Sequence, residues 1–136
     1  MKSDAVAPLL PPVVNPRHVT DCRDRLPDPA VMADAVEVFR ALGSPVRLQI
    51  VHALSHRELS VGDLARALDL SLSVTSHQLA QLRRLKLVSS RDEGRVTFYR
   101  AIDQCVDRLV HDCLAHTAEK LQSARPGRRR RSPRRP

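Results

Sequence analysis

The chain has few aromatic residues, few cysteines and no long apolar run. Its only aromatic side chains outside histidine are Phe39, Phe98 and Tyr99. A core must therefore consist mostly of Leu, Val and Ala, which favours packed helices. Three scattered cysteines exclude the disulfide framework of a small secreted domain. No apolar run approaches the roughly 18 residues of a membrane span. Prolines interrupt the apolar N-terminal stretch, so we expect no signal peptide and a cytoplasmic protein.

Catalytic motifs are also missing. The sequence has neither a glycine-rich phosphate loop nor a recognisable set of nucleophile, base and acid, so we predict that the protein is not an enzyme. A length of 136 residues fits one small domain. Because a small domain buries a lower fraction of its surface alone, we expect part of its apolar surface to be shared with a partner.

The positive charge is concentrated at the C-terminus. The net charge is +8, but the residues from Arg125 onward hold seven arginines and no acid, which leaves 16 basic against 15 acidic residues elsewhere. A basic tail is typical of proteins that contact nucleic acid and equally of a disordered, solubilising tail. Support for nucleic-acid binding must therefore come from the rest of the chain.

Proline marks the expected boundaries of the folded region. Of ten prolines, only Pro45 lies between residues 30 and 125. Residues 1–27 are rich in proline without a repeat, and we predict a disordered arm there. We predict a folded domain over residues 28–121 and a disordered, arginine-rich tail over residues 122–136.

Start and stop signals predict the first helices. Asp28–Pro29 is a cap followed by proline at the first helical position, and Gly43 ends that helix. Ser44–Pro45 repeats the start signal for a second helix that ends near His56. The first helix carries an apolar stripe, formed by Val31, Ala35, Val36, Phe39 and Leu42.

The stretch from Ser60 to Tyr99 predicts a winged helix-turn-helix. Ser60 caps a short third helix, residues 69–71 form a brief link, and Ser71 or Ser73 caps a helix that runs to Lys86. Two strand-like segments, 87–90 and 96–100, follow around a turn at 92–94. A long helix over about 102–121 completes a fold that is mainly α with a small β-hairpin.

The helix over 73–86 is the candidate for reading DNA. We expect Val74, Leu79, Leu82 and Leu85 to face inward and a polar set to face outward. Hydroxyl and amide groups near a helix N-terminus suit contact with bases and phosphates. A solvated polar face is the alternative, but the neighbouring hairpin arginines favour DNA. The candidate contacts are Ser73, Thr75, Ser76, His77, Gln78, Arg91 and Arg95.

Four segments carry a resemblance to a known family. FRALGSPVRLQIVHAL, ELSVGDLARAL, SVTSHQLAQLRRLKLV and GRVTFYRA resemble the ArsR/SmtB family of winged-helix repressors. The resemblance implies a homodimer paired through its first and last helices. It also implies repression of a nearby operon and release of operator DNA when an inducer, usually a metal ion, binds. DNA contacts are then expected at Ser73, Val74, Ser76 and His77, with a wing from Arg91 to Arg95.

The resemblance also implies a metal site on the last helix. Several family members bind zinc there, and the matching positions are Asp103, Cys105, His116 and Glu119, with Cys105 in place of a histidine. Residues 105 and 116 point within about 20° of each other but lie about 16 Å apart on a helix. One helix cannot supply every ligand, whereas two antiparallel copies can. A thiolate favours zinc, cadmium or another soft ion, and nickel, cobalt and mercury are further candidates.

Three alternatives stay open at this point. The four positions are also consistent with a polar helix face that buries Cys105 in a dimer interface, with Asp103 as an N-cap. Cys105 and Cys113 suit a redox or persulfide sensor of the same fold, although Cys113 is typical of a core residue. A module that binds nucleic acid or protein through its basic tail is the third. Cysteines that other members carry near Ser60 and Gly62 are absent, which leaves Cys22 and His18 without an expected partner.

Overall fold

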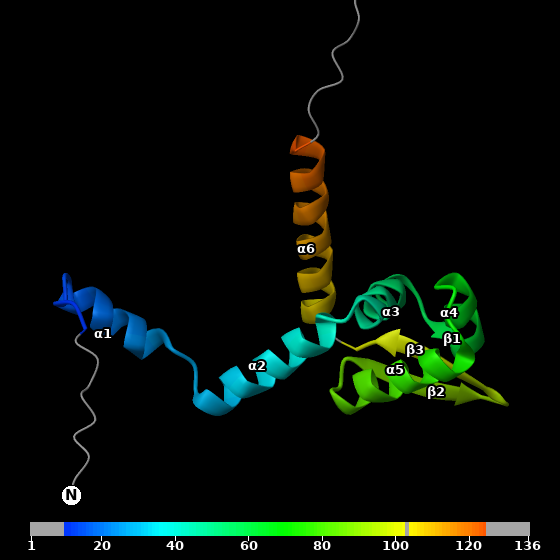
Figure 1. Ribbon diagram of the computed structural model, residues 1–136. Helices are drawn as coiled ribbons and strands as arrows, with labels where there is room; N and C mark the ends of the chain where they lie inside the picture. Colours follow the sequence, from blue (N-terminus) through cyan, green and yellow to red (C-terminus); the bar gives the residue numbers. More distant parts are fainter. Residues whose placement is uncertain (1–9, 103, 125–136) are drawn as a thin grey trace, which may run out of the picture. The chain divides into compact units, whose positions relative to one another are not determined.

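The computed structural model describes residues 10–102 and 104–124. Its contacts divide the chain into two units, Met1–Ala35 and Val36–Pro136. The elements occur in the order α1 (Pro16–Arg25), α2 (Pro29–Leu42), α3 (Pro45–His56), β1 (Leu59–Ser60), α4 (Val61–Ala67), α5 (Leu72–Arg84), β2 (Val88–Glu93), β3 (Val96–Ala101) and α6 (Gln104–Ser123). This order is mainly helical with a small sheet, as the sequence predicts (Figure 1).

The first unit contains a helix that the sequence analysis missed. The Asn15 side chain accepts hydrogen bonds from the backbone N–H groups of Arg17 and His18, at 3.1 and 3.3 Å, and Pro16 follows as the first helical residue. Asn15–Pro16 is therefore the same start signal that was recognised at Asp28–Pro29. No residue of α1 is buried. The prediction of disorder over 1–27 is wrong for residues 16–25, and residues 1–9 lie outside the described part.

Helices α2 and α3 begin where their start signals predict. Asp28 accepts a hydrogen bond from the Ala30 N–H at 2.7 Å, and Ser44 precedes Pro45 at the start of α3. The apolar stripe of α2 is largely exposed in the single chain: Ala41 is the one buried residue of this helix, and Phe39 is 60% exposed. In contrast, α3 buries Ile50, Val51 and Leu54.

The core of the second unit lies between α3, the α4–α5 pair and the sheet. Its fully buried side chains include Ile50, Leu64, Leu79, Leu82 and Val88. Ser60 caps α4 by accepting from the Asp63 N–H, and Ser71 caps α5 by accepting from the Val74 N–H, both at 3.1 Å. Of the two predicted caps for α5, Ser71 is therefore the one used. Within the second unit, Figure 1 shows α5 beside the sheet, and α5 contacts β2 directly.

The hairpin is part of a three-stranded antiparallel sheet in the order β1-β3-β2. Strand β1 has only two residues, too few to show an alternating pattern, and the sequence did not predict it. Glu93 pairs with Val96, so the turn is Gly94–Arg95 rather than the predicted 92–94. Gly94 has a φ of +61°, a conformation that glycine adopts without a Cβ clash.

Helix α6 packs on α3 but buries little of its own surface. Its one buried side chain is Val110, which belongs to the core cluster. Leu109, Leu114 and Leu121 are exposed, the last at 66%. Cys113 is exposed as well, which corrects the expectation of a core position. Among the described residues, no helix has the length and apolar character needed to cross a membrane.

Candidate nucleic-acid interface

The first turn of α5 presents several exposed side chains. Ser73, Ser76 and His77 are exposed, as predicted. Val74 was expected to face inward, but it is 41% exposed, because the buried face of α5 is formed by Thr75, Leu79 and Leu82. Its exposure agrees with the contact role that the family resemblance implies. A short surface of hydroxyls and an imidazole with the apolar side chains of Leu72 and Val74 at a helix start is suited to the major groove, where hydroxyls meet phosphates and a methyl group meets thymine.

Thr75 does not belong to this surface. Its side chain is 0% exposed, and its hydroxyl donates a hydrogen bond of 2.8 Å to the Ser71 carbonyl oxygen. The hydroxyl is therefore satisfied inside the helix, and the methyl group packs into the core. The prediction of Thr75 as an outward DNA contact is wrong.

A network of hydrogen bonds lies behind the exposed turn. One guanidinium nitrogen of Arg47, Nη1, donates to the Oε1 atoms of Gln78 and Gln81, both at 3.1 Å. The Nε of Arg47 donates to the Ala41 carbonyl oxygen at 2.8 Å. Gln81 Nε2 in turn lies 3.0 Å from His77 Nε2. Arg47 could not be recognised from the sequence. Only the fold brings it within reach of Gln78 and Gln81, which lie 31 and 34 positions further along the chain.

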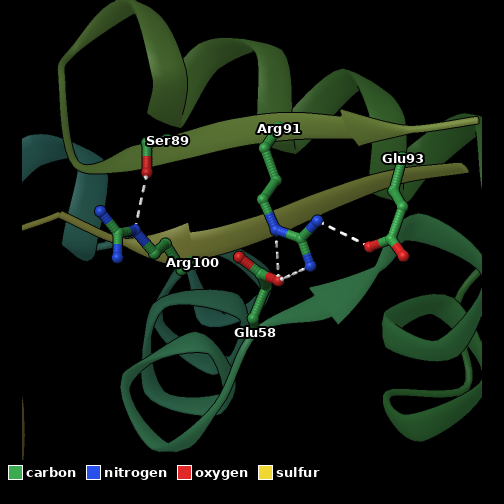
Figure 2. Close-up of polar contacts among 5 residues, drawn as sticks. All are labelled: Glu58, Ser89, Arg91, Glu93 and Arg100. Carbon is green, nitrogen blue, oxygen red and sulfur yellow. Dashed lines mark hydrogen bonds and ion pairs between the residues drawn. The ribbon is translucent and has the colours of Figure 1, made fainter.

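The wing contains an ion-pair cluster at its base (Figure 2). Arg91 on β2 donates from Nε to Glu58 at 2.8 Å and from Nη1 to Glu93 at 2.7 Å, and its guanidinium lies 4.7 Å from the centre of the Phe98 ring. Hydrogen bonding to Arg91 lowers the pKa of Glu58, and the same contacts raise the pKa of Arg91. Arg91 therefore holds the wing to the segment before β1, and reaching a phosphate requires it to leave these partners.

Arg95 occupies a different position in the wing. It is exposed at the hairpin turn, next to Gly94, and within the described residues it makes no ion pair. Arg83 and Arg84 are exposed in the last turn of α5. Of the two predicted wing arginines, Arg95 is therefore the one whose charge is available to a phosphate.

The predicted metal ligands lie along α6. Cys105, His116 and Glu119 are all exposed, whereas Asp103 lies outside the described residues. His116 and Glu119 are three positions apart and share a face of the helix. In the described part of this single chain, no three His, Cys, Asp or Glu side chains are close enough to hold one ion. The separation of about 16 Å between positions 105 and 116 on a helix is the reason.

Comparison with known proteins identifies relatives of this fold. The model of the family "Bacterial regulatory protein, arsR family" matches residues 44–90. The transcriptional regulator KmtR of Mycobacterium tuberculosis is 40% identical over 91 residues, which cover 67% of this chain and 69% of that protein. A homolog of the cadmium resistance regulatory protein CadC from Staphylococcus aureus is 34% identical over 87 residues, 63% of this chain and 72% of that protein.

A solved structure agrees with these matches. A homodimeric winged helix-turn-helix DNA-binding domain from Mycobacterium bovis, determined by NMR in solution, superimposes with a TM-score of 0.64 and 30% sequence identity. The match covers 72% of this chain and 91% of that domain. The predicted winged helix-turn-helix fold is therefore confirmed.

Proposed function

The chain belongs to the arsR family of bacterial regulatory proteins, and from this premise we propose that it is a homodimeric repressor that releases its operator when a metal ion binds. The observation that carries the DNA-binding part is the first turn of α5. Its exposed residues include Ser73, Val74, Ser76 and His77, and Arg95 extends the surface at the wing. The relatives are transcriptional regulators, and no feature of this surface calls for catalysis.

Exposed apolar side chains support a dimer through α2 and α6. Val36 and Phe39 on α2, and Leu109, Leu114 and Leu121 on α6, are all exposed in the single chain. Two helices that each leave apolar side chains in water are expected to bury them against a partner. The M. bovis domain, which is homodimeric, supports a homodimer here.

The residues on α6 fit a soft divalent ion shared between two chains. Cys105, His116 and Glu119 supply a thiolate, an imidazole and a carboxylate, all of which are zinc ligands in proteins, and Asp103 is the fourth proposed ligand. If two α6 helices run antiparallel, Asp103 and Cys105 of one copy meet His116 and Glu119 of the other. When bound, the ion would link the two helices. Zinc is our first candidate, followed by cadmium, nickel, cobalt and mercury, and the CadC homolog supports a metal of this class.

A metal titration of the DNA complex tests this proposal. The full chain is bound to a labelled operator fragment, and release is measured against zinc, cadmium, nickel, cobalt and mercury. We expect His116→Ala to bind DNA normally and to lose metal-induced release. His111→Ala is the matched control, because His111 lies on the same helix about 140° away from His116. Normal release by His116→Ala would overturn the metal assignment.

A second candidate is a thiol sensor of the same fold. The exposure of both Cys105 and Cys113 favours it, because oxidants reach exposed thiols most readily. Their eight-residue separation corresponds to about 12 Å along a helix, so a disulfide between them must join two chains. A non-reducing gel after mild oxidation distinguishes the two candidates: a covalent dimer that is absent in Cys105→Ser supports the thiol sensor.

A further inference from the structure

We propose that Arg47 determines which hydrogen-bonding groups α5 presents to the bases, although it lies on α3 and not on α5, the helix proposed to contact DNA. By fixing the amide of Gln78, and through Gln81 the imidazole of His77, it would make this surface a set of hydrogen-bond donors that selects guanine. This inference rests on the proposed DNA binding and goes beyond it, since it assigns a specificity role to a residue that does not itself contact DNA.

The first step follows from the chemistry of arginine. A guanidinium carries five N–H donors and no acceptor, so the side-chain atoms it contacts must be oxygens. The contacts from Arg47 Nη1 therefore fix Oε1 of Gln78 and Oε1 of Gln81 toward α3. Each glutamine amide is therefore held with its oxygen toward Arg47, and Nε2 is the amide atom of Gln78 that remains for a base contact in the proposed complex.

The second step is that Arg47 is itself held in place. Its Nε donates to the carbonyl oxygen of Ala41, a buried residue in the last turn of α2. All three contacts of Arg47 are partly buried, where a competing water molecule is less accessible. A guanidinium held from both sides is rigid, so the orientation of Gln78 is set before DNA arrives, and a pre-organised contact loses less entropy on binding.

Arg47 also orients His77, through Gln81. Because Gln81 Oε1 accepts from Arg47, its Nε2 is a donor, and the atom 3.0 Å away, His77 Nε2, must accept. A neutral imidazole that accepts at Nε2 carries its proton on Nδ1. His77 therefore also offers an N–H group. Gln78, which Arg47 orients directly, and His77, which it orients through Gln81, are then both hydrogen-bond donors toward DNA.

The fourth step compares the bases in the major groove. Guanine presents two adjacent acceptors, N7 and O6, which suit an N–H₂ group. Adenine places a donor beside its N7, and a bidentate contact from glutamine needs the amide oxygen and nitrogen to face the base together. Since Arg47 holds the oxygen of Gln78 away from the groove, this contact with adenine is unavailable, and guanine is favoured.

Selection from a random duplex DNA library tests the proposal with the full-length chain. Gln78→Ala identifies the position that Gln78 reads, as the one whose base preference disappears. We expect the unchanged chain to prefer guanine there by roughly tenfold, the order of one specific base contact. Arg47→Met, which keeps the apolar stem, frees the amide to rotate, and adenine should then be accepted as well as guanine.

Arg40→Met is the matched control. Arg40 lines the same cavity as Arg47, and its side chain pairs with Glu37 rather than with α5. This variant loses the same charge, so it should keep the guanine preference even if its overall affinity falls. A uniform loss of affinity with unchanged base preference in Arg47→Met would overturn the proposal, because that result is what a purely structural role predicts.

A second variant covers the case in which Arg47→Met does not fold. Gln78→Glu keeps an oxygen for Arg47 and replaces the outward donor with an acceptor, so the preference should change from guanine to cytosine, whose N4 is a donor. An unchanged guanine preference in Gln78→Glu, or adenine selected by the unchanged chain, contradicts the proposal. If the unchanged chain selects no sequence at all, the proposed repressor function fails as well, whereas a selected sequence with the wrong base overturns only the role of Arg47.

Discussion

Helices α5 and α6 differ in how much of their environment one chain supplies. Helix α5 buries Thr75, Leu79 and Leu82 in 13 residues, and two of its polar side chains, Gln78 and Gln81, are hydrogen-bonded to Arg47 on α3. Helix α6 buries only Val110 in 20 residues. The proposed DNA-contacting surface of α5 is therefore formed within a single chain, whereas the exposed leucines and the proposed metal ligands of α6 call for a second copy. This difference suits a repressor whose α5 stays constant while its α6 responds to an inducer.

The largest effect is expected from a cavity under α5. Leu79 is fully buried, so Leu79→Ala removes packing on every side and should lower the free energy of unfolding by about 2–5 kcal/mol. Urea unfolding followed by circular dichroism measures it. Leu121→Ala is the control on α6: at 66% exposure it should change stability little when unfolding is measured at a protein concentration that keeps the chain monomeric. Equal losses for both would remove the contrast between the two helices.

The next effect concerns association rather than folding. Leu109 on α6 is 40% exposed, and Leu109→Glu would place a charge in the proposed dimer interface. We expect self-association to weaken at least about tenfold, which corresponds to about 1.4 kcal/mol, while helix content is retained. Sedimentation equilibrium over a range of concentrations measures this. Arg108→Glu is the control, since it changes the charge by more than Leu109→Glu does, at an exposed neighbouring position.

Two adjacent residues of α5 separate stability from DNA contact. Thr75→Val keeps the shape of a buried side chain and loses the hydrogen bond to Ser71, so it should cost about 1 kcal/mol of stability and leave base preference unchanged. Ser76→Ala should do the reverse and weaken operator binding without changing thermal unfolding. If Thr75→Val altered base preference instead, Thr75 would not be buried when the protein is bound to DNA.

Local signals in the sequence were sufficient for most of the fold. Asp28–Pro29, Ser44–Pro45, Ser60 and Ser71 act within a few residues of the helices they start, so they can be recognised without knowing the rest of the structure. Asn15–Pro16 carries the same signal, but the surrounding prolines led to a prediction of disorder. The face of Thr75 was misjudged because its hydroxyl was taken as a sign of exposure, although Thr75, Leu79 and Leu82 follow the i, i+4, i+7 spacing of one buried helix face.

The candidate site was less predictable because its contacts join distant segments. Arg47 meets Gln78 and Gln81 only after α3 packs on α5, and Arg91 meets Glu58 only after β3 has paired with β1 on one side and with β2 on the other. Periodicity also identified the apolar stripe of α2 without revealing its partner. An amphipathic helix shows that a face will be buried, but not whether its own chain or a second copy covers it.

The smallest effect is expected at the wing, where the ion pairs are exposed. Arg91 lowers the pKa of Glu58, so this carboxylate stabilises the wing at pH values above the ordinary glutamate pKa of about 4.3, and the contribution is lost as the pH falls through the lowered value. An NMR titration of the Glu58 carboxyl carbon should give a midpoint below about 4.3. Arg91→Met should return it to the ordinary range, whereas Arg95→Met should not, since Arg95 is absent from the Glu58 contacts. An unshifted midpoint in the unchanged chain would mean that Arg91 is free to reach DNA, which would restore it beside Arg95 as a phosphate contact.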